Sequence, residues 1–111
     1  IMNKVLLTIS LLLICAFAIA DKGASPLIID VRTPAEWDRG HLDEAKHIEW
    51  QDIGAFISDL TSDKDETIYV YCRSGARSGK AKTILDELGY SNVINAGGVT
   101  DAQAFINARE N

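Results

Sequence analysis

Apolar residues form short continuous runs at several points along the chain, and these runs predict buried strands. Residues 27–31 and 67–71 are rich in branched and aromatic side chains, a composition typical of strands. Two weaker runs, at residues 45–48 and 92–94, predict two shorter strands. A polar loop at residues 61–66 separates the runs at 27–31 and 45–48 from those at 67–71 and 92–94.

Regularly spaced apolar residues between these runs predict helices. Over residues 52–60, and again over residues 78–88, apolar side chains recur at i, i+3, i+4 and i+7, which places them on one face of a helix. Gly89 directly follows the second segment and suits the turn that ends a helix. Each of these two segments therefore has one face that can pack on a sheet.

Two further segments carry signals for the start of a helix. Thr33 can cap a helix in which Pro34 takes the first position and Glu36 the third. Near the C-terminus, Gly97-Gly98 predicts a turn, after which Thr100 caps a final helix. Strands and helices thus alternate throughout, which favours a single α/β domain with a small, mainly parallel sheet and helices on both faces.

The N-terminal segment has the composition of a secretory signal peptide. Lys4 precedes an apolar run from Val5 to Ala20, which carries alanine at positions 18 and 20. A positive start, an apolar stretch and small residues before the cleavage point are typical of export signals. We therefore expect residues 1–20 to be a signal peptide and residues 21–111 to be the mature domain, located in the periplasm.

Composition narrows the classes of partner. The 111 residues carry a net charge of −5 at pH 7, which argues against nucleic-acid binding. The two histidines, His41 and His47, and the cysteine at position 72 show no metal-ligand spacing, so we expect no metal and no cofactor. Once the signal peptide is removed we expect no membrane contact, and a monomer or a weak dimer.

Cysteine usage points to one working thiol. Of the two cysteines, Cys15 leaves with the signal peptide, so Cys72 remains alone in the mature domain. A lone cysteine in an exported protein is either an inert core residue or a reactive thiol. Cys72 directly follows the strand at 67–71, at the sheet edge where parallel α/β proteins bind ligands, and we expect it to be exposed. The polar residues after it favour the reactive thiol.

The loop after Cys72 has the features of an anion cradle. Gly75 lets the backbone curl, so that several N–H groups can point inward at the start of the following helix. Neighbouring arginines, Arg73 and Arg77, add positive charge that lowers the pKa of a cysteine. Phosphatases place five residues between cysteine and arginine, whereas here there are four. The tighter loop favours a smaller group, such as a sulfur atom carried on the cysteine, over a phosphate, and leaves a phosphatase or arsenate reductase as a weaker alternative.

At this point the chain resembles the single-domain rhodaneses, and among them the small periplasmic type. The segments that carry the resemblance lie in the family's order and cover nearly all of the mature domain: 29-IDVRTPAEW-37, 40-GHL-42, 70-VYCRSGARSGKAKTIL-85, 88-LGY-90 and 95-NAGGVTD-101. The resemblance implies a rhodanese-like fold and a thiosulfate sulfurtransferase. In such an enzyme a cysteine thiolate takes the outer sulfur of thiosulfate as a persulfide, and cyanide or a thiol then removes it.

Carried over by position, Cys72 is the nucleophile and the persulfide carrier. The resemblance implies that backbone amides of the loop hold the charge of the persulfide; this loop comprises Arg73, Ser74, Gly75, Ala76 and Arg77. Arg73 and Arg77 are candidates to bind the thiosulfate anion.

Asp30 and Arg32 follow the first strand and face the same edge. We expect Asp30 to orient a loop arginine, with a purely structural salt bridge as an equal alternative for both residues. We expect His41 to be a hydrogen-bonded structural residue. The alternative function is a persulfide carrier or partner-binding module with little turnover on thiosulfate.

Overall fold

The computed structural model describes residues 25–111 of the chain. The predicted signal peptide at residues 1–20, with Cys15, lies outside the described residues. Within residues 25–111, no helix has the length and apolar character needed to cross a membrane.

Strands and helices alternate along the chain as the hydrophobic pattern predicts. The elements, in order, are β1 (Leu27–Asp30), α2 (Pro34–Asp38), β2 (Lys46–His47), the 3₁₀ turn η2 (Trp50–Asp52), α3 (Ile53–Leu60), β3 (Ile68–Cys72), α4 (Ala76–Glu87), β4 (Val93–Gly98) and α5 (Val99–Glu110). Thr33 caps α2 as expected: its side chain accepts from the Glu36 N–H, and the Glu36 side chain accepts from the Thr33 N–H.

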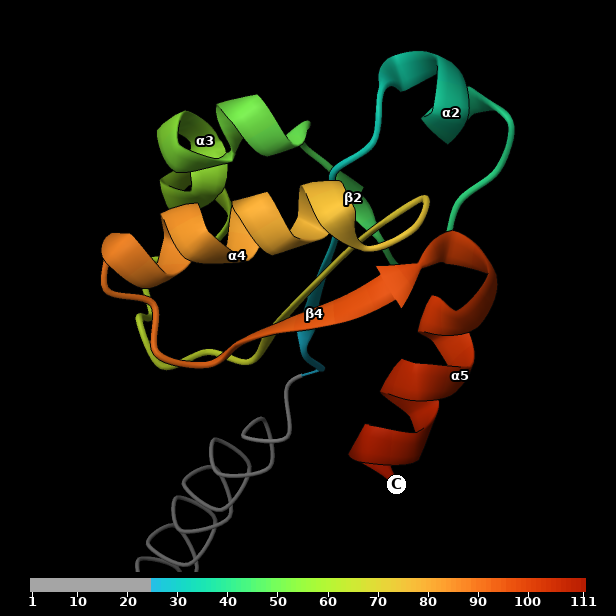
Figure 1. Cartoon of the computed structure of the whole chain (residues 1–111). Coiled ribbons are helices and arrows are strands. Elements are labelled where there is room, and N and C mark those ends of the chain that lie inside the picture. The colour runs from blue at the N-terminus through green and yellow to red at the C-terminus, as the bar shows by residue number, and fades with distance from the viewer. Residues whose placement is uncertain (1–24) are drawn as a thin grey trace, which may run out of the picture.

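The four strands form one parallel sheet in the order β2-β1-β3-β4. In Figure 1, α3 and α4 lie on one side of this sheet and α5 lies on the other. The α/β fold with helices on both faces is therefore confirmed. Because Asp30 pairs with Tyr71, the carboxyl ends of β1 and β3 lie side by side at one edge of the sheet.

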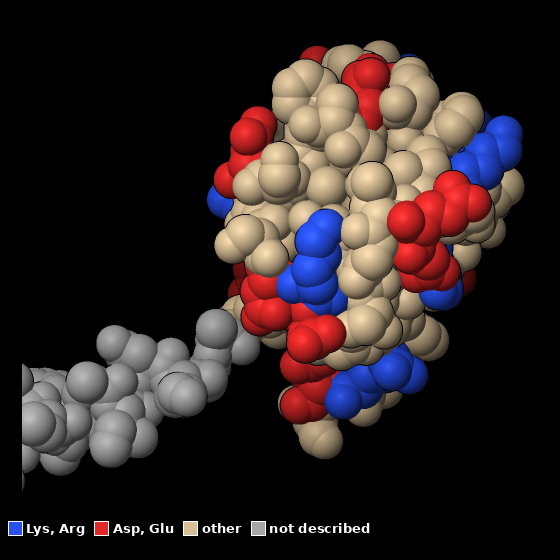
Figure 2. Space-filling model, turned by 90° about the vertical axis from the view of Figure 1, so that its left-hand side faces the viewer, with Lys and Arg blue, Asp and Glu red and all other residues tan. Residues whose placement is uncertain are grey.

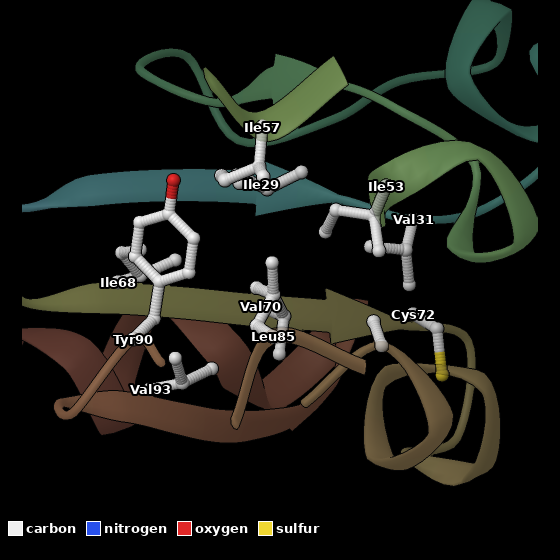
Figure 3. Packing of buried hydrophobic residues seen from close by; sticks show 11 residues of the cluster. Ile29, Val31, Ile53, Ile57, Ile68, Val70, Cys72, Leu85, Tyr90 and Val93 are labelled. Carbon is white, nitrogen blue, oxygen red and sulfur yellow. The ribbon is translucent and has the colours of Figure 1, made fainter. Parts of the chain in front are cut away.

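Alternate side chains along the strands enter two separate cores, one on each face of the sheet. The core beneath α3 and α4 includes Ile29, Val70, Ile57 and Leu85 (Figure 3). The core beneath α5 includes Ile28, Tyr69, Ala102 and Ile106. Both faces of β1 and β3 are thus buried, which explains why these strands appear in the sequence as continuous apolar runs.

Most element boundaries differ from the sequence prediction by a residue or two, and three of the differences bear on the site. Helix α4 begins at Ala76, two residues before the predicted start at Ser78. Strand β4 continues through Gly97-Gly98, so the predicted turn there is wrong. Helix α5 begins at Val99 with Gly98 as its cap, so Thr100 lies inside the helix and does not cap it.

The register between β3 and β4 gives the physical reason for the longer strand. Asn95 pairs with Val70 and Gly98 pairs with Cys72, so β4 spends one more residue than β3 over the same distance. This is a β-bulge, and Gly97 adopts the positive φ of 84° that such a bulge needs. The glycines therefore bend a paired strand where the sequence suggested a turn.

Acidic and basic side chains lie interspersed over the face that Figure 2 draws. On that face of the described residues there is no continuous basic surface of the kind that attracts nucleic acid. This arrangement agrees with the acidic net charge of the chain.

Candidate active site

Parallel pairing brings the two strand-end motifs of the sequence to one edge. Asp30 ends β1 and Cys72 ends β3, and these strands are neighbours in the sheet. The cysteine loop follows directly and leads into α4, as Figure 1 shows. The structure therefore places the cysteine loop beside Asp30 and Arg32.

Cys72 is more enclosed than the sequence suggested. It is the last residue of β3 rather than the first residue after it, and only 1% of its surface is exposed. Its side chain contributes to the core beneath α4, and Figure 3 shows the sulfur at the end of that core, beside the loop. The expectation of an exposed cysteine was wrong, because the loop and the start of α4 fold over the thiol.

Hydrogen-bond donors converge on the sulfur in spite of this burial. The Gly75 N–H donates to Cys72 Sγ at 2.9 Å, and the Ser78 hydroxyl lies 3.4 Å from the same atom. A buried thiol with no donors would favour the neutral form, whereas donors aimed at sulfur favour the thiolate. This geometry distinguishes Cys72 from an inert core cysteine.

The pKa of Cys72 is lowered from 9.0 to about 7. Burial raises this pKa and is the largest single influence, but four hydrogen bonds together outweigh it. The donors are the Ser78 hydroxyl and the backbone N–H groups of Ser78, Ser74 and Gly75. The sequence prediction attributed the lowered pKa partly to Arg73 and Arg77, whereas the leading favourable influences are these neutral donors.

Gly75 sets the shape of the loop. Its φ of 104° lies in the left-handed region, where glycine is favoured, and this turn starts α4. The loop then packs directly against β4: a Cβ added at Gly98 would lie 2.5 Å from the Arg73 carbonyl oxygen. The predicted curl at Gly75 is confirmed, and the close approach of Gly98 explains why β4 carries glycine there.

Asp30 makes the structural salt bridge that the sequence analysis gave as one of two alternatives, whereas the partner of Arg77 was not predicted. The Asp30 carboxylate is fully buried and binds Arg32, not an arginine of the cysteine loop, with the shortest N–O distance at 2.7 Å. Arg77 binds both carboxylate oxygens of Glu36, at 2.7 and 2.9 Å. This hydrogen-bonded contact with Arg77 holds the pKa of Glu36 well below its usual range. Arg77 is therefore engaged in a bond between α4 and α2.

A hollow of about 440 Å³ opens beside the cysteine loop. Its lining residues are Arg32, Glu36, Arg39, Gly40, Arg73 and Val99. Within residues 25–111, neither Arg39 nor Arg73 has an acidic partner at salt-bridge distance. Since Arg32 and Glu36 are each neutralised by a partner, these two arginines leave the hollow positive.

The remaining polar candidates have structural contacts. Nδ1 of His41 lies 2.8 Å from the Leu42 carbonyl oxygen, and the ring stacks on Trp37, which confirms its structural role. His47 also stacks on Trp37, and its Nε2 lies 2.7 Å from the Arg32 carbonyl oxygen. In the described part of the chain, no group of His, Cys, Asp and Glu side chains has the arrangement of a metal site.

Sequence reasoning missed four residues that the structure places at this edge: Glu36, Arg39, Ser78 and Asn95. Ser78 was read only as the start of a helix, and Asn95 only as part of a glycine-containing motif. Counting residues from Cys72 could have singled out Ser78, since it takes the position that arginine holds in the phosphatase spacing. No local signal points to Asn95.

Comparison with known proteins identifies the family. The sequence pattern of the rhodanese-like domain matches residues 18–104. The chain belongs to the rhodanese-like domain family. This rhodanese-like domain is 42% identical over 73 residues to the thiosulfate sulfurtransferase PspE of Escherichia coli strain K12, a match that covers 66% of this chain and 70% of that protein.

Further relatives and solved structures agree with this assignment. The domain is 39% identical over 72 residues to a sulfurtransferase of Allochromatium vinosum, covering 65% of each protein. Among solved structures it is similar to a rhodanese with anions from E. coli, with a TM-score of 0.67 and 40% identity. That similarity covers 69% of this chain and 91% of the solved one.

Proposed function

We propose that this rhodanese-type sulfurtransferase takes the outer sulfur of thiosulfate onto Cys72 as a persulfide and passes it to cyanide or a thiol. The observation that carries the proposal is the convergence of N–H and O–H donors on a buried Sγ whose pKa is about 7. Such a thiolate is available as a nucleophile near neutral pH, which an ordinary buried thiol is not. The names of the similar sulfurtransferases support the same chemistry.

The transfer takes two balanced steps. In the first, the Cys72 thiolate attacks the outer sulfur of thiosulfate, a new S–S bond forms, and sulfite leaves with the electron pair of the old one. In the second, cyanide or a thiolate attacks the terminal sulfur, and Cys72 departs as a thiolate. In the second step negative charge develops on the departing Cys72 Sγ, and the donors fixed around this atom stabilise it.

In this proposal the loop holds the persulfide. The N–H groups of Ser74, Gly75 and Ser78 already favour charge on Sγ. We propose that Ser74 and Gly75, with the other loop amides between Arg73 and Arg77, donate to the terminal sulfur once it is bound. Asp30 and Arg32 support the site structurally in this proposal, since their charges are satisfied by each other.

We assign the hollow beside the loop to the donor anion. Arg73 keeps its predicted role, because it lines the hollow and has no acidic partner within residues 25–111. Arg39 joins it in this role. Arg77 acts indirectly in the proposal, by tying α4 to α2 through Glu36.

The remaining parts of the proposal concern the whole chain. Residues 1–20 act as a signal peptide and residues 21–111 form the mature domain, which works in the periplasm as a monomer or weak dimer. The composition of residues 2–20 supports this location.

The test is the intact mass of the domain before and after thiosulfate, with Cys72→Ser as the matched control. We expect a gain of about 32 Da, one sulfur atom, which cyanide removes and which the variant does not show. An unchanged mass in the wild type would overturn the assignment of thiosulfate as donor. Loading without steady turnover to cyanide or small thiols would instead favour the persulfide carrier that serves a protein partner.

A further inference from the structure

Asn95, in strand β4, makes three hydrogen bonds around the cysteine loop. Its Oδ1 accepts from the Ser78 hydroxyl at 2.7 Å and from the Gly97 N–H at 2.9 Å. Its Nδ2 donates to the Gly75 carbonyl oxygen at 3.0 Å. Gly75 and Ser78 are also two of the residues whose donors reach Cys72 Sγ. Asn95 therefore contacts two of the residues that hold the sulfur.

The Ser78 hydroxyl has one proton and two acceptors. Asn95 Oδ1 lies at 2.7 Å and Cys72 Sγ at 3.4 Å, so the two acceptors compete for the same O–H. Ser78 is fully buried, which leaves no water on its side chain to take either place. When charge develops on Sγ, rotation of the Ser78 hydroxyl turns its hydrogen bond from Asn95 Oδ1 to the sulfur. Oδ1 still accepts from the Gly97 N–H, so it is not left without a partner.

An amide suits this position better than a carboxylate or an aliphatic side chain. A carboxylate could accept from Ser78 and Gly97, but it would hold the Ser78 proton more strongly and would place a like charge near the thiolate. It would also lack the second donor to the Gly75 carbonyl oxygen, which accepts from the Gly79 N–H as well as from Asn95 Nδ2. An aliphatic side chain would leave the Gly97 N–H without its present acceptor and the Gly75 carbonyl with one donor in place of two.

We propose that Asn95 is a positioning residue for sulfur transfer: it holds the Gly75 peptide in its left-handed turn and keeps the Ser78 hydroxyl poised between amide and sulfur. The part that Asn95 plays in catalysis rests on the proposed sulfurtransferase function. The hydrogen bonds of Asn95 with both residues carry it.

The charged groups at this edge are left unchanged in the test. Asp30 and Arg32 stand at the end of β1, and Arg77 of α4 is bound to Glu36 of α2. Strand β4 itself contributes no charged side chain. A shift of the thiol titration in Asn95→Ala therefore does not come from altering a charge, whereas Asn95→Asp combines the loss of the amide donor with one added negative charge.

The experiment measures the alkylation rate of Cys72 by iodoacetamide against pH in the wild type, Asn95→Asp and Asn92→Asp. In the wild type the rate rises with pH through about 7 and then levels, because the thiolate is the reactive form. Asn95→Asp moves this midpoint up by about one unit, so that the rate falls about tenfold at pH 6 and little at pH 9. Asn92→Asp is the matched control. Asn92 lies just before β4, away from the cysteine loop, and its side-chain amide donates to Thr67 Oγ1.

Equal midpoints for Asn95→Asp and Asn92→Asp would overturn the proposal, because the effect would then be one of net charge. A second set guards against a variant that does not fold: Asn95→Ala, Ser78→Ala and the double variant, each checked by circular dichroism. We expect the sum of the midpoint shifts of the two single variants to exceed the shift of the double variant, since Asn95 acts partly through Ser78. Additive shifts would contradict this coupling.

The readout separates this inference from the proposed function. Alkylation uses no thiosulfate, so the Asn95 result stands whether or not the wild type gains sulfur. A shifted midpoint with no sulfur loading in the wild type would overturn the sulfurtransferase mechanism and keep the role of Asn95 in activating the thiol. Normal sulfur loading in the wild type with an unshifted midpoint in the Asn95 variants would support the sulfurtransferase mechanism and overturn the role of Asn95.

Discussion

At the scale of the single residue, two opposed influences act on the protonation of the Cys72 thiol. Its burial at the end of β3 favours the neutral thiol, while fixed donors around Sγ favour the thiolate, and the second influence prevails. The donors cost little to arrange because the loop and helix α4 fix most of them as backbone N–H groups. The lowered pKa of this thiol thus results from the hydrogen-bond donors that surround it more than from neighbouring charges.

Gly98 is a second residue whose surroundings explain its identity. Its φ of −90° is open to any residue, but an added Cβ would lie 2.5 Å from the Arg73 carbonyl oxygen, which is backbone and cannot rotate away. We predict that Gly98→Ala displaces the cysteine loop, raises the alkylation midpoint of Cys72 and abolishes most sulfur loading by thiosulfate. Titration and intact mass measure the two effects.

Gly79→Ala is the matched control for this substitution. A Cβ at Gly79 would meet only Asn95 Nδ2, at an ordinary 3.6 Å, and alanine favours the helix by about 1 kcal/mol. We expect Gly79→Ala to fold and load sulfur like the wild type. Comparable losses in both variants would show that the close approach at Gly98 is unimportant.

At the scale of elements, the ion pair between Glu36 and Arg77 joins two helices far apart in the sequence. Helix α2 presents Glu36 from its capping box, and α4 presents Arg77 from its first turn. The pair holds α2 against the mouth of the hollow, and it also places a carboxylate in the lining. Removing the negative charge from this element should therefore change both stability and anion binding.

We predict that Glu36→Gln lowers the free energy of unfolding by up to about 1 kcal/mol, the value of a partly exposed pair. Glutamine preserves the capping box, so α2 should still form. We also expect a lower KM for thiosulfate at low salt, because the hollow loses one negative charge. Denaturant titration and steady-state kinetics measure the two quantities.

Glu87→Gln, an exposed site at the end of α4, makes the same change of charge outside the hollow. It should alter neither quantity appreciably. A KM for thiosulfate that rises in Glu36→Gln would mean that the donor does not bind in this hollow.

At the scale of the whole molecule, a domain of negative net charge carries a positive hollow beside its cysteine. The chain has a net charge of −5, whereas the hollow retains two arginines without acidic partners in residues 25–111. A small anion is repelled by most of the surface and attracted at one place, which focuses its approach. The attraction should weaken as salt is added.

We predict that Arg39→Gln raises the KM for thiosulfate about twofold to fivefold at low salt, the effect of one exposed charge. The variant should also show a weaker salt dependence of kcat/KM than the wild type. Steady-state kinetics over a series of salt concentrations measure both effects. Arg109→Gln in α5 removes the same charge away from the hollow, and an equal rise in KM there would refute the assignment.

The sequence by itself predicted the elements and singled out Cys72 as the candidate nucleophile. Buried strands, the capping box at Thr33 and Glu36, and the turn at Gly75 all depend on residues close together in the chain, so their patterns are local and readable. The alternation of strands and helices fixed a parallel sheet, and a parallel sheet brings its strand ends to one edge. That Cys72 and Asp30 lie at the same edge follows from that topology, while their being neighbours depends on the strand order β2-β1-β3-β4.

Only the tertiary structure decided how the side chains at that edge are partnered. Arg77 meets Glu36 across 41 residues, and Asn95 meets Ser78 across 17, so neither pair leaves a local pattern. The bulge in β4 sets the registration of Asn95 and Gly98 against the loop, and a glycine pair reads equally well as a turn. Burial of Cys72 likewise depends on how α4 packs over the sheet. These contacts result from packing between distant segments, which is why they become visible only in the folded molecule.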